Sequence, residues 1–177
     1  MVIFATSILL AGCVHVVLSH YEVKLSWWVS FPSIGAFYAG LFFFFDRFLW
    51  KWTPIRAVLQ IKIPVLHGEW IGHVEPASGE KVEARVATLT IDQHWSTINV
   101  TLNSGESESR STMASIADER TSRPVLQYVY NNEPRASAVE TMHRHSGTAR
   151  LTLERKNGEV RLAGGYYTGL KGDGKPA

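Results

Sequence analysis

Hydrophobic residues follow two different patterns along this chain, and the pattern changes at about residue 60. The first part holds two almost unbroken apolar runs, residues 1–19 and 27–45, with the polar stretch HYEVKLS between them. From residue 67 onward, apolar and polar residues alternate, which is typical of strands with one buried face. The pattern predicts a helical hairpin at 1–52, a linker at 53–66 and an all-β domain at 67–177.

Each apolar run has about the length of a membrane-spanning helix, which needs roughly 20 residues. Tryptophan pairs stand at both ends of the second run, and tryptophans concentrate at the two interfaces of a bilayer. An arginine close behind the run would lie among the headgroups. We therefore predict a two-span α-helical membrane hairpin whose interface residues are Trp27, Trp28, Arg47, Trp50 and Trp52.

Positive charges follow the second run and are almost missing from the connector between the runs. Arg47, Lys51, Arg56 and Lys62 lie after the second run, whereas the connector carries only Lys24. Because positive residues stay on the cytoplasmic side of a membrane, we expect both the N-terminus and the β domain to be cytoplasmic.

Two other interpretations of the first fifty residues stay open. The stretch LAGC at 10–13 matches a lipoprotein cleavage site, although the basic segment that normally precedes such a site is missing. The two runs could also pack as a buried soluble helical hairpin, although neither has a polar face. His15 lies inside the first run, where it is either a functional residue or a neutral imidazole hydrogen-bonded within the hairpin.

The alternating part of the chain predicts seven strands separated by turn residues. Asn157-Gly158 is the strongest hairpin signal among these turns. Strands joined in sequence order favour an antiparallel up-and-down barrel of lipocalin-like form. A Gly-rich stretch follows the seventh strand, so we expect an eighth strand to be missing from this chain. The predicted strands are 67–75, 82–91, 95–103, 106–117, 124–131, 145–155 and 159–168.

The fourth predicted strand indicates what lines the interior of the barrel. One of its faces carries acidic and basic side chains and must meet water, so the other face points inward. That inward face carries Ser107, Ser109, Ser111, Met113 and Ser115. A buried hydroxyl without a partner costs about 1–3 kcal/mol, so these serines favour a polar ligand inside the barrel.

Tyrosines share the inward face of the later strands. Tyr128 and Tyr130 lie on one face of the fifth strand, and Tyr166 and Thr168 lie on one face of the seventh. Aromatic rings and hydroxyls that converge in a cavity suit a planar, polar ligand. The other interpretation is that these tyrosines are ordinary core aromatics with satisfied hydroxyls.

Composition narrows the class of protein. The formal net charge is +2, with 18 Lys and Arg against 16 Asp and Glu, which is too even for a surface that binds DNA or RNA. The single cysteine, Cys13, excludes an internal disulfide. His143 and His145 lack the further ligands of a metal site. The run of serines lacks an adjacent base, so we predict no enzyme activity. We also predict no metal and no cofactor.

Several short motifs occur in an order that resembles a known family. The motifs are GEWIGHV, ESESRSTMASI, LQYVYNNEP, HSGTARLTL and LAGGYYT, and they follow the predicted hairpin. In this order they resemble the two-transmembrane, β-strand-rich membrane effectors of bacterial CBASS anti-phage systems. The resemblance covers nearly the whole chain, and the missing eighth strand is a departure from the family pattern.

This resemblance implies a defence effector of the bacterial inner membrane. Its cytoplasmic barrel would bind a cyclic dinucleotide made by an associated nucleotidyltransferase. Binding would drive self-association, and the clustered hairpins would disrupt the lipid bilayer and kill the infected cell. Hydroxyls would contact phosphate or sugar, and tyrosine rings the bases. The implied pocket residues are Ser107, Ser109, Ser111, Tyr128, Tyr130, Asn132 (or its neighbour Asn131), Tyr166 and Thr168.

Two other functions compete with this one. A membrane-anchored lipocalin-like carrier of a small apolar ligand would need an apolar interior, against which the inward serines argue. An assembly factor with a solid barrel would bind a protein partner on its outer surface.

Overall fold

The computed structural model of the chain describes residues 2–21, 27–75, 85–118, 123–139, 142–156 and 158–168. The chain forms two compact units. One unit comprises Met1–Ile61 together with His94–Ser96, and the other comprises Lys62–Gln93 and Thr97–Ala177. The two units are described one after the other below.

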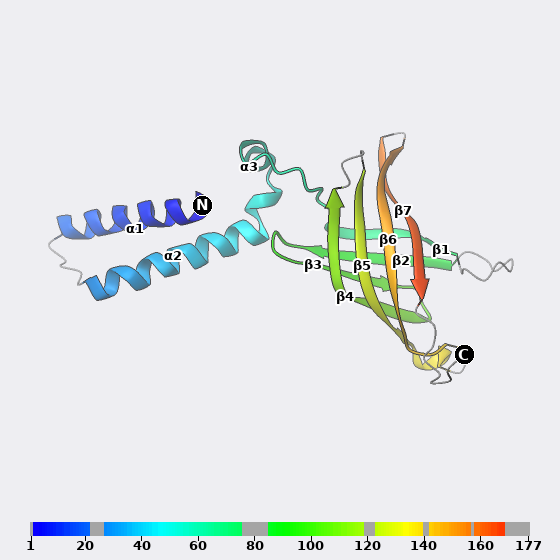
Figure 1. The fold of residues 1–177 in the computed structure, drawn as a ribbon. Coiled ribbons are helices and arrows are strands. Elements are labelled where there is room, and N and C mark those ends of the chain that lie inside the picture. The colour runs from blue at the N-terminus through cyan, green and yellow to red at the C-terminus, as the bar shows by residue number, and fades with distance from the viewer. Residues whose placement is uncertain are drawn as a thin grey trace, which may run out of the picture. The chain divides into compact units, whose positions relative to one another are not determined.

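The first unit contains the two helices of the predicted hairpin, α1 (Val2–His20) and α2 (Trp27–Arg47), shown in Figure 1. A short 3-10 helix, η1 (Leu49–Lys51), and a third helix, α3 (Thr53–Val58), follow. A proline in the first turn of α3 favours its start, because the amide hydrogen that proline lacks has no helical partner there.

The pairing of α1 and α2 is confirmed, and the ring of Phe4 meets that of Tyr38 edge to face at 6.4 Å. Within the described part of the chain, no helix is at once long enough and apolar enough to cross a bilayer. The hairpin of helices is thus observed, and its transmembrane placement stays a prediction.

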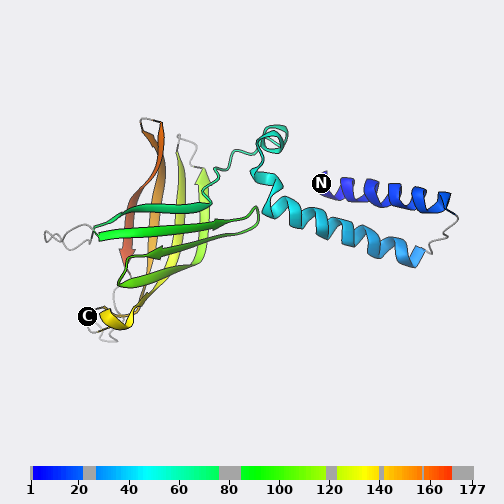
Figure 2. The ribbon, with the colours of Figure 1, turned by 180° about the vertical axis from the view of Figure 1, so that it is seen from behind.

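The second unit is a single antiparallel sheet in which seven strands follow one another in sequence order. Figure 1 and Figure 2 show that the sheet is strongly curled. The seven predicted strands and their order are confirmed. The strands are β1 (Gly68–Val74), β2 (Arg85–Gln93), β3 (Ile98–Asn103), β4 (Ser107–Asp118), β5 (Pro124–Pro134), β6 (His145–Lys156) and β7 (Glu159–Thr168).

The two outer strands of the sheet each have one neighbour. Among the described residues, β1 pairs only with β2, and β7 pairs only with β6. The described sheet is thus curled but open, and the closed barrel and its eighth strand stay predictions. At the turn between β6 and β7, Gly158 has a φ of 84°, as the Asn-Gly signal predicts, while Asn157 itself lies outside the described residues.

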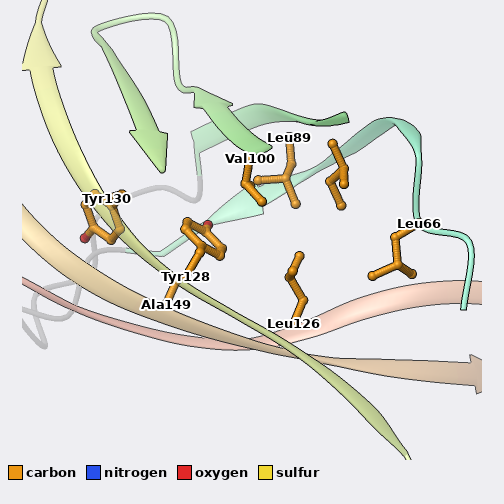
Figure 3. Packing of buried hydrophobic residues seen from close by; sticks show 8 residues of the cluster. Leu66, Leu89, Val100, Leu126, Tyr128, Tyr130 and Ala149 are labelled. Carbon is orange, nitrogen blue, oxygen red and sulfur yellow. The ribbon is translucent and has the colours of Figure 1, made fainter. Parts of the chain in front are cut away.

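Apolar side chains fill the inward face of the curled sheet. Figure 3 shows this packing, in which Leu66 joins the core although it precedes β1. The amide N–H of Leu66 donates to Gln93 Oε1 at 2.6 Å, and Trp70 Nε1–H donates to the carbonyl of Leu66 at 2.9 Å. The central side chains are Leu66, Leu89, Ile91, Val100, Leu126, Tyr128, Tyr130 and Ala149.

A bulge in β4 changes which of its side chains face this core. The register of β4 against β5 shifts between Ser111 and Met113, so Thr112 is an extra residue. Beyond the bulge, Ala114 packs against the core, whereas Met113 is 71% exposed. The prediction that Met113 and Ser115 face inward is therefore wrong, because one extra residue inverts the alternation of a strand.

Candidate ligand-binding site

Polar side chains gather on the inward face of β4 and β5. Ser107, Ser109 and Asn132 are all buried there. Ser109 lies opposite Asn132 in the strand register, and its hydroxyl donates to Asn132 Oδ1 at 2.8 Å. The amide of Asn132 donates in turn to the sulfur of Met142 at 3.4 Å. Contacts at both ends thus fix the orientation of the Asn132 carboxamide.

The inward serines predicted from the sequence are present, but their hydroxyls have protein partners. The hydroxyls of Ser107 and Ser104 lie 3.1 Å apart, within hydrogen-bonding distance. Ser111 Oγ accepts the amide N–H of Val100 at 2.9 Å and so ties β4 to β3. These serines therefore have a structural role in addition to any contact with a ligand.

Tyr128 and Tyr130 differ from the serines because their hydroxyls lack such partners. Both residues are 6% exposed, and their ring centroids lie 6.0 Å apart. Figure 3 shows both rings on the core side of β5. Neither hydroxyl has a hydrogen-bond partner among the residues that the structure describes. Because neither hydroxyl is among the fully buried polar atoms, each can form hydrogen bonds with water or with a polar ligand.

Burial also sets the protonation state of these tyrosines. It raises the pKa of Tyr128 to about 12, with a smaller contribution from the neighbouring Tyr130. Burial likewise raises the pKa of Tyr130, and Tyr166 contributes in the same direction. Both hydroxyls are therefore protonated at neutral pH and can donate hydrogen bonds to a ligand.

The position of the Tyr130 ring depends on β6. Gly147 lies opposite Tyr130 in the register, and a Cβ at that position would lie 2.5 Å from Tyr130 Cζ. The ring of His145 meets that of Tyr130 edge to face at 6.4 Å. The ring thus occupies space that only a glycine leaves free.

The two predicted site residues on β7 differ in how close they lie to this cluster. Tyr166 packs against the core, and its hydroxyl donates to the carbonyl of Glu75 at 3.2 Å. Thr168 is exposed at the end of β7. The structure therefore groups Ser107, Ser109, Ser111, Tyr128, Tyr130 and Asn132, with Tyr166 beside them and Thr168 apart.

The predicted interface residues of the first unit have unlike surroundings. Trp50 is only 1% exposed, while Trp52 is largely exposed. The guanidinium of Arg47 lies 5.7 Å from the centre of the Phe43 ring. The side chains of Trp27 and Trp28 lie outside the described residues. Burial of Trp50 gives it a packing role that the hydropathy pattern did not predict.

Three residues that shape the sheet unit were not predicted from the sequence. Gln93 is buried at the end of β2, and Met142 and Gly147 contact or accommodate site side chains. Of these three, only Gln93 could have been recognised from the sequence, because its polar side chain continues the inward-facing row of Leu89 and Ile91 on β2. The partners of Met142 and Gly147 are distant in sequence, so no local pattern marks them.

The interior is more apolar than the serines alone predicted. Apolar side chains occupy most of it, and among the described residues of the sheet unit the buried polar side chains are those of Gln93 on β2, Ser107 and Ser109 on β4, and Asn132 on β5. Within the described residues, no three potential metal ligands lie together. The chemistry available here is hydrogen bonding and stacking on neutral groups.

Comparison with known proteins gives two kinds of match. Residues 61–174 match the family described as "Cap15, cyclic dinucleotide receptor domain". The chain is 30% identical over 154 residues to a CD-NTase-associated protein 15 of Staphylococcus schleiferi, covering 87% of this chain and 74% of that protein. It is 30% identical over 140 residues to one of Yersinia aleksiciae, covering 78% and 63% of the two chains. No solved structure gave a significant match.

Proposed function

This chain belongs to the Cap15 family of CBASS effectors, and from that premise we propose that its sheet unit binds a cyclic dinucleotide against β4 and β5. The observation that carries the proposal is the pair of buried residues Tyr128 and Tyr130, whose hydroxyls have no hydrogen-bond partner among the described residues. A cyclic dinucleotide offers acceptors on its phosphates, sugars and bases, and it has planar bases for the two rings.

The neighbouring groups suit the same ligand. Asn132 presents an amide whose orientation is set by Ser109, and amides of fixed orientation distinguish the edges of bases. Tyr166 adds a third ring beside the pair. Because the tyrosines stay protonated, they donate hydrogen bonds without the repulsion that a phenolate would have toward a phosphate.

The proposal extends to the rest of the chain. An associated nucleotidyltransferase supplies the cyclic dinucleotide during infection, and binding drives self-association in anti-phage defence. The helical unit then acts on the inner membrane from the cytoplasmic side and damages it. In the sheet unit, an eighth strand between β1 and β7 closes the barrel. Exposed apolar side chains on α1 and α2, such as Phe4, Leu9 and Phe44, and the basic residues after α2 support this role.

Calorimetric titration of the full chain in detergent tests the binding step. The panel comprises cyclic di-GMP, cyclic di-AMP and 3′,3′-cyclic GMP-AMP, with a cyclic trinucleotide and a fatty acid. We expect one cyclic dinucleotide to bind with a micromolar or lower Kd. Binding of the fatty acid alone would instead favour the lipocalin-like carrier, and binding of no compound would contradict the proposal.

Three tyrosine variants locate the binding site. Tyr128→Phe and Tyr130→Phe each remove one hydroxyl and should weaken binding by about 3- to 10-fold, the effect of one hydrogen bond. Tyr167→Phe is the matched control, because Tyr167 is 78% exposed and its hydroxyl should not meet the ligand. Equal affinities of all three variants would place the site elsewhere.

A further inference from the structure

The turn between β2 and β3 is attached to the end of α2. The carbonyl of Asp46 accepts the amide N–H of Trp95 at 3.0 Å, and its carboxylate accepts the amide N–H of Ser96 at 2.7 Å. The ring of Trp95 lies 5.4 Å from that of Phe45 and 6.1 Å from that of Trp50. One residue near the end of the helix thus holds two successive backbone amides.

These contacts satisfy groups that the helix end would otherwise leave open. Asp46 is the penultimate residue of α2, where backbone carbonyls have no partner within the helix. The Trp95 amide supplies that partner. The turn residues His94–Ser96 are accordingly part of the helical unit, whereas the strands on either side of them are part of the sheet unit.

The residue just before the turn holds the segment that leads into β1. The side chain of Gln93 accepts the amide N–H of Leu66 at 2.6 Å and donates to the carbonyl of Pro64 at 3.0 Å. Both ends of the Gln93 amide are therefore used to fix the segment that leads from α3 to β1.

A short chain of contacts joins the candidate site to this turn. Tyr130 lies opposite Ser111 in the register, and Ser111 Oγ accepts the amide N–H of Val100. Val100 lies near the start of β3, which begins at Ile98 directly after the turn. A ligand that shifts Tyr130 therefore acts on the strand that continues into the attached turn.

The attachment of the turn also leaves one polar group unsatisfied. Trp50 Nε1 is buried and has no hydrogen-bond partner among the described residues. A buried polar group without a partner costs free energy, so the packing around Trp50 is not fully satisfied. Transmission of a discrete change through this cluster requires that it have two arrangements.

We propose that the β2–β3 turn transmits occupancy of the candidate site to the end of α2, through β3 and the contacts of Trp95 and Ser96 with Asp46. This inference rests on the proposed function, because it requires a ligand at Tyr130. It adds the route by which binding reaches the helices. A ligand acts in this way only if it binds one arrangement of the turn better than the other.

Hydrogen–deuterium exchange on the full chain tests the route. Exchange at residues 42–49 and 94–97 is measured with and without each cyclic dinucleotide of the panel. In the unsubstituted chain, binding should change exchange at both segments. Asp46→Ala and Trp95→Ala should keep the Kd within about 2-fold, as expected for substitutions outside the site, but lose the response at residues 42–49.

Conservative substitutions serve as matched controls. Asp46→Asn keeps a side-chain oxygen that can accept the Ser96 amide, and Trp95→Phe keeps a ring against Phe45, so both should retain the response. If Trp95→Ala fails to fold by circular dichroism, the comparison of Asp46→Ala with Asp46→Asn decides, since it removes a single acceptor.

Three other outcomes would overturn the inference, and each can be told apart from the others. Binding without any change at residues 42–49 refutes the route and leaves the proposed function intact. A full response in a variant that lacks the Asp46 carboxylate or the Trp95 ring also refutes it. If no cyclic dinucleotide binds the unsubstituted chain, the proposed function fails and the route fails with it.

Discussion

Tyr130 can occupy its place because the residue opposite it on β6 is a glycine. A side chain at Gly147 would meet both the tyrosine ring and the carbonyl of Tyr167. The shape of the candidate site is therefore determined by a residue that itself contributes no functional group. Adding a single methyl group to a packed interior lowers stability, so a larger side chain at Gly147 should be destabilising.

Substitution of Gly147 tests this dependence. Gly147→Ala should lower the free energy of unfolding by about 1–3 kcal/mol, because the added methyl group overpacks the core. Gly165→Ala on the neighbouring strand is the control, because a Cβ there meets nothing within 4 Å. Urea unfolding of both variants gives the comparison, and equal stabilities would contradict the packing described here.

The hydrogen bond of Ser109 to Asn132 has an exposed counterpart that serves as its control. Ser109→Ala leaves the buried amide oxygen of Asn132 without its donor and should lower the free energy of unfolding by about 1–3 kcal/mol. Ser146→Ala removes a similar bond to Asn131 on the outer face, where water replaces the serine. It should cost less than about 0.5 kcal/mol. Similar losses in urea unfolding would show that the inner pair is not buried in solution.

The raised pKa of Tyr128 makes stability depend on alkaline pH. The folded value of about 12 lies above the ordinary 10.0, so the unfolded chain loses this proton first as the pH rises. The contribution is fully present below pH 10 and is lost as pH rises toward the folded pKa, by at most about 3 kcal/mol. Unfolding measured from about pH 9 to 11 should show this fall. The slope should be smaller in Tyr128→Phe and unchanged in Tyr167→Phe.

The strands could be predicted from alternation, whereas the bulge in β4 could not. Alternating residues identified all seven strands, the inward serines and the inward tyrosines. The extra residue leaves no mark in the sequence, because Thr112 is polar like Arg110 and Ser111 before it. The last residues of β5, Asn132 to Pro134, were predicted to be a loop from their turn-forming types. Pairing with β4 overrides that local preference.

Because of the bulge, we expect two single-residue deletions in β4 to lower the free energy of unfolding by very different amounts. Deleting Thr112 removes the unpaired residue and keeps the facing of every later side chain, so it should cost about 1–2 kcal/mol. Deleting Ser115, which is also polar and exposed, would turn Ile116 outward and should cost more than about 4 kcal/mol. Thermal unfolding separates the two, and comparable losses would mean that the register shift is not as described.

The candidate site and the apolar helices lie in different units of the molecule. Every residue of the candidate site, and every residue of the core beneath it, lies in the sheet unit. The helical unit carries the apolar helices and the attached turn. Hydropathy alone predicted this division, but the assignment of residues 94–96 to the helical unit could not be predicted, because their partner is distant in sequence.

This division predicts that the sheet unit binds alone. Residues 62–177 should fold and bind the same cyclic dinucleotide with a Kd within about 3-fold of the full chain, since the fragment keeps the site and its core. Circular dichroism and calorimetry provide the comparison. A folded fragment that has lost binding would show that the helical unit contributes to the site.

The bulge at Thr112 also bears on how this family can change over generations. Most strand positions cannot gain or lose a codon without moving core side chains to the surface. At this position a one-codon deletion leaves the facing of the strand intact. Length variation among descendants of a common ancestor should therefore be found at Thr112 sooner than elsewhere in β4, and a one-residue gap in their aligned sequences would mark a neutral event rather than a change of ligand.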